Sequence, residues 1–173
     1  NHPNIVTIHE VGDFKGRPFI VTEYAGERTL SDVVGSKKLT SSGVINIIIQ
    51  ICEGLEDAHN AGIVHRDIKP SNIVFEKNGH PKIVDFGLAV FQGAQKITKS
   101  GSAMGTVGYM SPEQLRGTTV DRRTDLFSVG VVLYELITGK NPFAAENGAA
   151  VQHLILSGQP EPMARFKAGV PDG

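Results

Sequence analysis

The sequence predicts an α+β fold that is mainly helical and carries a small β-hairpin near its N-terminus. Two long stretches place apolar residues at helical spacing, whereas several short runs rich in Ile, Val, Thr and Phe are typical of strands. The 173 residues are 40% hydrophobic and 20% charged, which is ordinary for a globular protein. Because no linker, repeat or low-complexity tract divides the chain, we expect one domain or a large part of one.

The first two strands are expected at residues 5–8 and 19–23, where Ile, Val, Thr and Phe predominate. Residues 12–16 between them begin and end with glycine, which suits a turn between paired strands. The N-terminal segment is therefore predicted to form an antiparallel hairpin.

The first helix is predicted by apolar residues that recur at helical spacing from Val44 to Ala58. The pattern stops before Gly62, and glycine is a natural C-terminal cap of helices. We expect one face of this helix to be buried in the core.

Three strand-like segments follow at residues 63–64, 73–75 and 82–84. Asn78-Gly79 lies between the last two and is a strong signal for a tight turn. These two strands are therefore expected to pair.

A long loop is expected at residues 90–108, which are rich in Gly, Ser and Thr and show no apolar period. A loop of this length in a compact domain is usually functional or mobile. Helical spacing returns over residues 125–138, and Gly139 closes this second buried helix.

Composition excludes several classes of partner. There are 17 Lys and Arg residues and 18 Asp and Glu residues, so the net charge of −1 gives no electrostatic reason to expect nucleic acid or an anionic membrane. Cys52 is the single cysteine and cannot form an internal disulfide, so a cytoplasmic location is expected for this domain and Cys52 is expected to be a small core residue. No apolar stretch is long enough to span a bilayer.

Two clusters of polar residues lie beside the predicted strands. Residues 65–72 connect two short strands, and Asp85 ends the next one, so the tight turn would bring Asn72 and Asp85 near each other. Their oxygen atoms are hard ligands that suit Mg²⁺ better than zinc. Asp67 is left free to accept a proton, and Lys69 offers a positive charge to a transferring phosphoryl group.

These motifs have the order and spacing of a known signature. His65-Arg66-Asp67, followed by Asn72 and then by Asp85-Phe86-Gly87, resembles the catalytic motifs of protein kinases. Ser111-Pro112-Glu113 resembles the end of the kinase activation segment, with Ser in place of the usual Ala, and Asp125-Leu126-Phe127 resembles the start of the central helix, with Phe in place of a common Trp. The chain is identified as a member of the eukaryotic-type serine/threonine protein kinases, and it looks most like bacterial members.

The resemblance implies a protein-kinase-like fold and a role for each matching residue. Asp67 becomes the catalytic base, Lys69 contacts the γ-phosphate, and Asn72 and Asp85 hold Mg²⁺. Asp125 would accept backbone hydrogen bonds from the catalytic loop, although it could equally cap its helix. The residues implied to contact ATP are the gatekeeper Thr22, the hinge residues Glu23, Tyr24 and Ala25, the adenine floor Val74, and Lys69, Ser71, Asn72 and Asp85.

Further implications concern packing and partners. Ile8, His65 and Phe86 would stack in a hydrophobic column between two lobes, and Lys69 together with Thr106 matches the serine/threonine branch. Arg66 beside the catalytic Asp is typical of kinases whose activation loop is ordered by a phosphate, so autophosphorylation at Thr98 or Ser100 is expected. The other expected partners are ATP, Mg²⁺ and a protein substrate that offers Ser or Thr.

The resemblance also implies domain boundaries. Residues 1–25 would be the end of the N-lobe and the hinge, and residues 26–173 an incomplete C-lobe. The Gly-rich loop, the V-A-I-K lysine and the αC glutamate of the family would lie upstream of Asn1, and the arginine that usually pairs with Glu113 would lie downstream. This polypeptide alone is therefore expected to be inactive and marginally stable, and the full-length protein could be membrane-anchored.

Two alternatives remain open. A non-catalytic kinase-like module that binds nucleotide or proteins would result if the upstream lysine were replaced, but Asp67, Asn72 and Asp85 are all intact. A Mg²⁺-dependent phosphohydrolase using Asp67 and Asp85 would leave the matches at Ser111-Pro112-Glu113 and Asp125 unexplained.

Overall fold

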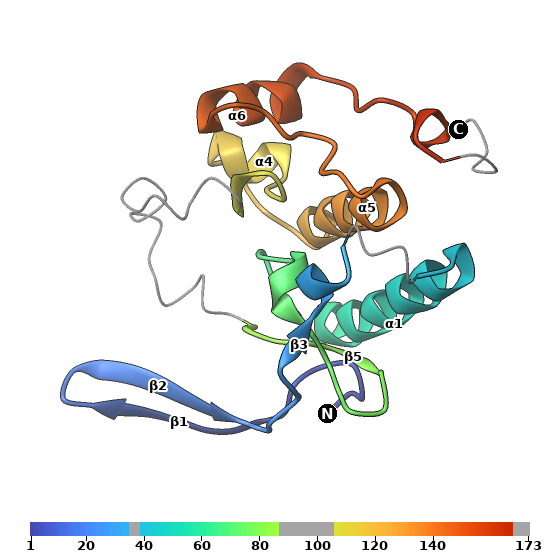
Figure 1. Ribbon diagram of the computed structural model, residues 1–173. Coiled ribbons are helices and arrows are strands. Elements are labelled where there is room, and N and C mark those ends of the chain that lie inside the picture. Colours follow the sequence, from blue (N-terminus) through green and yellow to red (C-terminus); the bar gives the residue numbers. More distant parts are fainter. Residues whose placement is uncertain (35–38, 87–105, 168–173) are drawn as a thin grey trace.

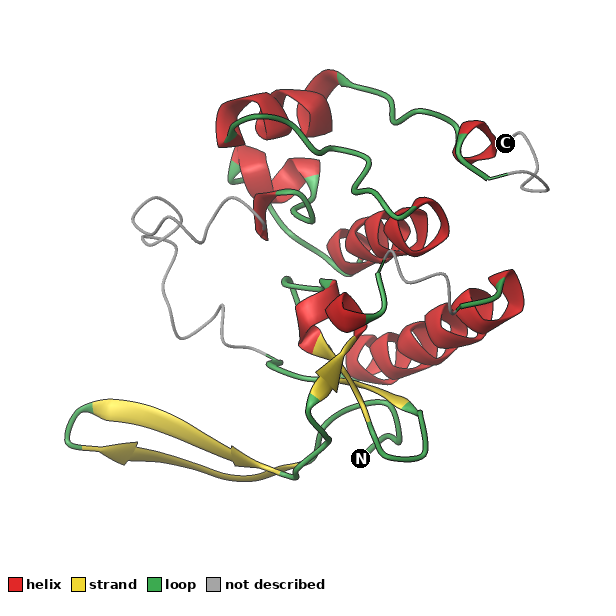
Figure 2. Ribbon diagram, viewed as in Figure 1, coloured by secondary structure: helices red, strands yellow, loops and turns green. Residues whose placement is uncertain are grey.

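A computed structural model of the protein describes residues 1–34, 39–86 and 106–167. A helical body carries a β-hairpin that projects away from it, and a small sheet lies between the two (Figure 1). Figure 2 shows that the strands gather toward the end of the body that holds the N-terminus. The elements are, in chain order, β1 (Ile8–Phe14), β2 (Arg17–Thr22), β3 (Arg28–Thr29), η1 (Leu30–Asp32), α1 (Ser41–Asn60), η2 (Pro70–Asn72), β4 (Ile73–Phe75), β5 (Pro81–Ile83), α4 (Pro112–Arg116), α5 (Arg123–Thr138), α6 (Gly148–Ser157) and η3 (Met163–Arg165), where η marks 3-10 helices.

The predicted hairpin is present, but its first strand and its turn lie elsewhere than expected. β1 and β2 pair antiparallel around a two-residue turn in which Lys15 and Gly16 both have positive φ, at 54° and 75°. This conformation matches the twist of a hairpin. Gly12 belongs to β1, where it lies opposite Phe19, and a Cβ atom there would lie 2.4 Å from the Phe19 ring. Gly12 therefore makes room for an aromatic ring, and only Gly16 serves the turn.

The segment before β1 joins the hairpin to the body. Residues 5–8 were expected to form a hairpin strand, but Ile5 makes an isolated parallel bridge to Ile83 in β5. The Val6 N–H donates to the Ile83 carbonyl at 2.9 Å, and the Ile83 N–H donates to the Asn4 carbonyl at 2.8 Å. Ile5 and Val6 therefore attach to the second sheet, whereas Thr7 bonds to Glu23 and Ile8 begins β1.

The second sheet has the order β3-β4-β5, with both pairs antiparallel. The tight turn predicted at Asn78-Gly79 is confirmed, and Gly79 has a φ of 87°. The strand predicted at residues 63–64 is wrong, because the Ile63 N–H donates to the Ala58 carbonyl at 2.9 Å and closes the end of α1. The short strand β3 carries no sequence signal of its own and was not predicted.

The two long predicted helices are confirmed as α1 and α5. Thr40 caps α1 by accepting the Gly43 N–H at 3.1 Å, and Gly139 ends α5 with a φ of 74°. α5 begins at Arg123, two residues earlier than expected, so Asp125 lies in its first turn. The main core lies between α1, α5 and the second sheet, and its buried residues are Leu30, Val33, Ile47, Ile51, Leu55, Ile68, Ile73, Ile83, Val129 and Val132.

The C-terminal part of the described chain has a second core. α6 and the residues before it pack on the other side of α5, with Val107, Val131, Phe143, Val151 and Ile155 buried together. Cys52 is partly buried against the main core, as expected for a small core residue. No helix in the described ranges is long and apolar enough to cross a membrane. The predicted loop lies outside the described residues except for residues 106–108, and so do Thr98 and Ser100.

Candidate active site

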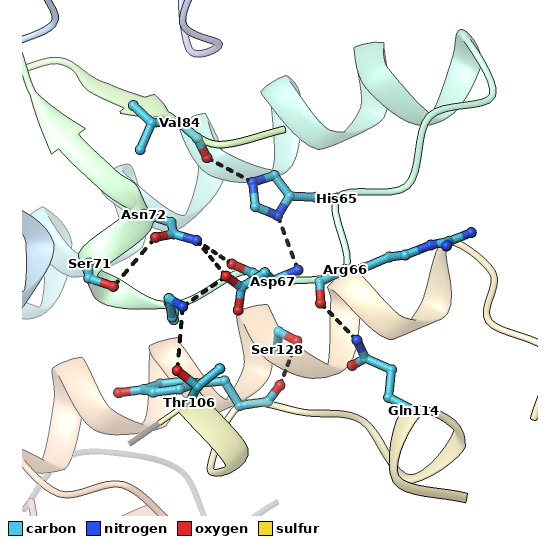
Figure 3. A network of polar contacts seen from close by, with 11 residues as sticks. His65, Arg66, Asp67, Ser71, Asn72, Val84, Thr106, Gln114 and Ser128 are labelled. Carbon is cyan, nitrogen blue, oxygen red and sulfur yellow. Dashed lines mark hydrogen bonds and ion pairs between the residues drawn. The ribbon is translucent and has the colours of Figure 1, made fainter. Parts of the chain in front are cut away.

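Three of the predicted catalytic residues meet around one carboxylate. The Lys69 ammonium donates to Asp67 Oδ2 at 2.8 Å, and Asn72 Nδ2 donates to the same oxygen at 3.0 Å and to the Asp67 carbonyl at 2.8 Å (Figure 3). The Lys69 ammonium also lies 3.5 Å from Oγ1 of Thr106, the residue at which the last described range begins. Within the described chain only Oδ2 of Asp67 has hydrogen-bond partners, and 37% of its side chain is exposed. Its other oxygen, Oδ1, is left open to a reactant.

His65 supports the loop of residues 65–72 through both of its ring nitrogens. Its Nε2 lies 2.9 Å from the Val84 carbonyl, which can only accept, so Nε2 carries the proton and Nδ1 accepts the Asp67 N–H at 3.2 Å. Burial lowers the pKa of His65 despite the raising effects of the Val84 carbonyl and the nearby carboxylates. A buried neutral imidazole with both nitrogens engaged is a structural residue. Its ring makes an edge contact with Phe86 at 4.6 Å between centroids.

Asp125 fixes the backbone of the loop from the opposite side. Its fully buried carboxylate accepts the His65 N–H at 2.9 Å, the Arg66 N–H at 2.7 Å and His59 Nε2 at 2.8 Å. Arg66 has a φ of 68°, a conformation that non-glycine residues adopt at a cost, and Gln114 holds its carbonyl at 2.7 Å. Of the two roles considered for Asp125, acceptance of loop hydrogen bonds is therefore the observed one.

Sequence reasoning missed two of these supports. His59 follows Leu55 by one helical turn, so the same apolar period that predicted α1 also places His59 toward the core. Gln114 carried no signal, because its position relative to the loop depends on the tertiary packing of α4.

Asp85 is linked to Asn72 through the backbone. The Val84 N–H donates to the Asn72 carbonyl at 2.9 Å, and the following Asp85 is exposed with a φ of 65°. Among the described residues, no hydrogen bond joins the Asp85 side chain to Asn72. Asp85 and Thr22 instead line a cavity of about 290 Å³ together with Val6, Ile8, Val11, Pro18, Phe19, Ile20 and Phe86.

Asn72 and Asp85 offer oxygen donors of the kind that suits a magnesium ion. Because Asn72 directs its Nδ2 to Asp67, its Oδ1 faces the other way and has only a long contact of 3.5 Å from Ser71 Oγ (Figure 3). An amide oxygen and the exposed carboxylate of Asp85 are the hard donors that Mg²⁺ prefers. In the described ranges there is no group of three or more His, Cys, Asp or Glu side chains that could hold a metal ion.

The predicted hinge crosses the edge of the second sheet. Thr22 ends β2, Ala25 is buried, and Val74 in β4 is partly buried. The Val74 Cγ1 atom lies 3.8 Å from the position that a Cβ atom on Gly26 would take. The Tyr24 side chain is 73% exposed and lines a separate cavity of about 670 Å³, away from Asp85. Tyr24 can therefore contribute to the site around Val74 only through its backbone.

An ion pair between buried Lys82 and partly buried Glu23 fixes the hinge carboxylate. Glu23 Oε1 accepts the Lys82 ammonium and the Thr7 N–H, each at 2.8 Å, and Lys82 lies 3.5 Å from Glu76. The hydrogen bond from Lys82, with that from Thr7, lowers the pKa of Glu23 to about 2. Burial alone would lower the pKa of Lys82, but the two carboxylates raise it. Sequence analysis missed Lys82, whose one signal was a charge inside an otherwise apolar strand.

A family model described as a protein kinase domain matches residues 1–168. The chain belongs to the protein kinase family. The predicted resemblance and the protein-kinase-like α+β fold are thereby confirmed.

Bacterial serine/threonine-protein kinases are among the similar proteins. PknB of Mycolicibacterium smegmatis is 39% identical, with 98% of this chain and 28% of the relative covered. Probable serine/threonine-protein kinases of Streptomyces coelicolor and Clostridium perfringens are 40% and 41% identical, covering 93% and 89% of this chain and 25% and 23% of the relatives. The kinase domain seen here thus spans about a quarter of the length of the curated relatives it matches.

The structure explains one departure from the kinase pattern. Ser111, which replaces the usual Ala, is fully buried, caps α4 by accepting the Gln114 N–H at 3.3 Å, and shares a 2.5 Å hydrogen bond with Thr124. Thr124 in turn donates to Glu113 Oε1 at 2.8 Å. The Ser111 hydroxyl thus extends a polar network that joins α4 to α5.

Proposed function

We propose that this chain carries the catalytic loop of a serine/threonine protein kinase that transfers the γ-phosphoryl group of ATP to Ser and Thr hydroxyls of protein substrates. The observation that carries the proposal is the Asp67 carboxylate, which Lys69 and Asn72 hold at one oxygen while the other stays open. Membership of the protein kinase family supports it. Residues 1–25 then belong to the N-lobe and hinge and residues 26–173 to the C-lobe.

Each residue at the loop has a role in this reaction. The open Oδ1 of Asp67 accepts the proton of the substrate hydroxyl as its oxygen attacks phosphorus, so the hydroxyl becomes the better nucleophile. Lys69 holds Asp67 in place and offers its positive charge to the phosphoryl oxygens. Asn72 orients Asp67 through its Nδ2 and leaves its Oδ1 for a cation.

Nucleotide binding divides between two groups of residues. Asn72 and Asp85 would hold Mg²⁺, and the ion would neutralise charge on the phosphates and orient them. Ser71, beside Asn72, would contact the nucleotide as well, and its Oγ lies 3.5 Å from Asn72 Oδ1. The backbone of Glu23, Tyr24 and Ala25 would bind the adenine edge, Val74 would form the floor beneath it, and Thr22 would border the cavity behind it.

The remaining expectations belong to the full-length protein. We propose that it phosphorylates itself at Thr98 or Ser100 and thereby orders its activation loop around Arg66. Its kinase domain would work in the cytoplasm, and the rest of the protein could anchor it to a membrane.

The proposal is tested with the full-length protein, Mg²⁺, ATP and a mixture of Ser- and Thr-containing peptides. Mass spectrometry should detect phosphate on Ser and Thr residues of the peptides and of the enzyme itself. Phosphate only on Tyr would contradict the assigned branch of the family. Tight ATP binding without any phosphate transfer would favour the non-catalytic module, and release of inorganic phosphate alone would favour the phosphohydrolase.

A further inference from the structure

Lys82 in β5 is a buried cation to which the roles above assign no function. The residue is 7% exposed, and its ammonium contacts Glu23 Oε1 at 2.8 Å and Glu76 Oε1 at 3.5 Å. Burying a lysine is costly unless it is paired, and here two carboxylates pair with it. One of them belongs to the hinge.

Glu23 is fixed through both its side chain and its backbone. Its Oε1 accepts the Thr7 N–H at 2.8 Å, and its own N–H donates to the Thr7 carbonyl at 2.9 Å. Lys82 therefore completes a network that ties the hinge to the segment before β1 and to β5. The segment before β1 is itself bonded to β5 through Val6 and Ile83 at 2.9 Å.

The register of the sheet relates Lys82 to the nucleotide site. Val74 and Lys82 are direct partners in the antiparallel pair β4-β5. Side chains of directly opposed residues lie on the same face of a sheet, so Lys82 rises beside the proposed adenine floor. The ammonium group reaches the hinge from the same face on which the adenine ring would lie.

The other end of the hinge is held by a close backbone contact. Gly26 has a φ of 128°, and a Cβ atom there would lie 2.3 Å from the Phe75 carbonyl oxygen of β4. Between the two fixed points, no described backbone group bonds to the Ala25 N–H or to the Glu23 and Ala25 carbonyls. These groups are among those that remain available to an adenine edge.

We propose that Lys82 is a positioning residue for nucleotide binding: it sets the height of the hinge backbone above Val74, and so the slot that receives the adenine ring. This inference rests on the proposed kinase function. Without the ammonium group, the carboxylates of Glu23 and Glu76 would share a site with no cation between them. Their repulsion would release the Glu23 side chain and loosen the hinge at the residue that begins the adenine-binding segment.

The experiment compares wild-type full-length protein with Lys82→Met, Lys82→Arg and Lys77→Met. Met keeps the length of the side chain and removes its charge, whereas Arg retains the charge. Lys77 is an exposed lysine in the turn after β4 and serves as the matched control. The readouts are the dissociation constant for ATP, kcat at saturating ATP, and hydrogen exchange of the amides of residues 23–25.

Lys82→Met should weaken ATP binding about tenfold, because a charge-assisted hydrogen bond that orders the hinge is lost. It should also speed exchange of the hinge amides, while kcat at saturating ATP stays within about twofold because Asp67, Lys69 and Asn72 are untouched. Lys82→Arg should restore most of the affinity, and Lys77→Met should behave as the wild type. If Lys82→Met does not fold, Glu23→Gln breaks the same ion pair at nearly constant volume and should give the same pattern.

Several outcomes would overturn the inference. An unchanged ATP affinity in Lys82→Met, or a fall in kcat without a change in affinity, would show that Lys82 does not position the nucleotide. A wild type that binds ATP but transfers no phosphate would refute the proposed function, while the affinities of the variants would still decide the role of Lys82. A wild type that binds no nucleotide would refute both.

Discussion

Single residues at the site adopt backbone conformations that only their surroundings can hold. Arg66 and Asp85 have φ values of 68° and 65°, although neither is glycine; Arg66 precedes the proposed base Asp67, and Asp85 is itself a proposed Mg²⁺ ligand. Non-glycine residues in this region cost of order 1 kcal/mol each, so the structure must supply compensating contacts. Asp125 and Gln114 supply them at Arg66. At Asp85 the same conformation turns the chain immediately after the strand, where the carboxylate becomes exposed.

Gly26 is the residue at which a single methyl group should do most harm to the hinge. Gly26→Ala forces a Cβ atom toward the Phe75 carbonyl at a φ of 128°, so it should destabilise the protein by about 1–3 kcal/mol. Gly130→Ala is the matched control, because Gly130 lies inside α5 with open space around it and should gain up to about 1 kcal/mol of helix propensity. Urea unfolding measures both. Equal stability of the two variants would contradict the close contact at Gly26.

The ion pair at Glu23 predicts a pH dependence of stability. The pKa of this carboxyl falls from its ordinary value of 4.5 to about 2 in the folded protein. A depressed folded pKa stabilises the protein above the unfolded pKa, and this contribution is lost as the pH falls from about 4.5 toward 2. The difference in unfolding free energy between wild type and Glu23→Gln, measured at pH 5 and pH 3, should therefore shrink at pH 3. A constant difference would show that Lys82 does not lower the pKa of Glu23.

At the scale of elements, α5 holds the proposed catalytic loop (residues 65–72) in place as well as filling the core. Its inward face contributes Val129 and Val132 to the main core, while its first turn presents Asp125 to the loop backbone. α1 supports the same carboxylate through His59. The catalytic loop thus rests on two packed helices, and rigid support of this kind is what precise positioning of catalytic groups requires.

Removing the Asp125 carboxylate should therefore damage stability and function together. Asp125→Ala leaves the buried His65 amide and the partly buried Arg66 amide without their acceptor, which should cost about 3 kcal/mol and misplace Asp67. Asp121→Ala serves as the control, because Asp121 is exposed and pairs only with Arg123 among the described residues. Thermal unfolding and phosphotransfer are the measurements. A stable and active Asp125→Ala variant would contradict the anchoring role.

The sequence predicted the elements whose signals are local and missed those set by tertiary contact. The period of α1 and α5 and the turn at Asn78-Gly79 are properties of a few neighbouring residues, and all three were located. The prediction of a strand at residues 63–64 was wrong, because the Ile63 N–H bonds back to the end of α1 and this hydrogen bond sets the conformation of the segment. Gly12 was assigned to a turn because its role depends on Phe19 across the hairpin.

The site was predictable in part for the same reason. Asp67, Lys69 and Asn72 lie within six residues of one another, so their meeting is a local event that the motif describes. Lys82 pairs with Glu23, which is 59 residues away in sequence, and no short pattern contains both. The supports of a site are therefore harder to read from sequence than its reacting groups.

At the scale of the whole molecule, the described hairpin carries exposed apolar side chains. Val11, Phe14 and Phe19 are 57%, 65% and 39% exposed, so the hairpin contributes little to the core. The 173 residues also contain no Gly-rich loop and no V-A-I-K lysine, both of which contact the phosphates in kinases. The polypeptide of these residues alone should therefore transfer no phosphate under conditions in which the full-length protein is active. Equal activity of the two polypeptides would contradict the expectation that phosphotransfer needs a Gly-rich loop and a V-A-I-K lysine in addition to these residues.

The proposed phosphotransfer depends most on Asp67, and one measurement tests the role of this residue directly. Asp67→Asn in the full-length protein keeps the size of the side chain and removes the group that accepts the proton. Phosphotransfer to a Ser or Thr substrate should fall by about 10²–10⁴-fold, while the dissociation constant for ATP stays close to that of the wild type. An Asp67→Asn variant that turns over at the wild-type rate would contradict the assignment of Asp67 as the catalytic base.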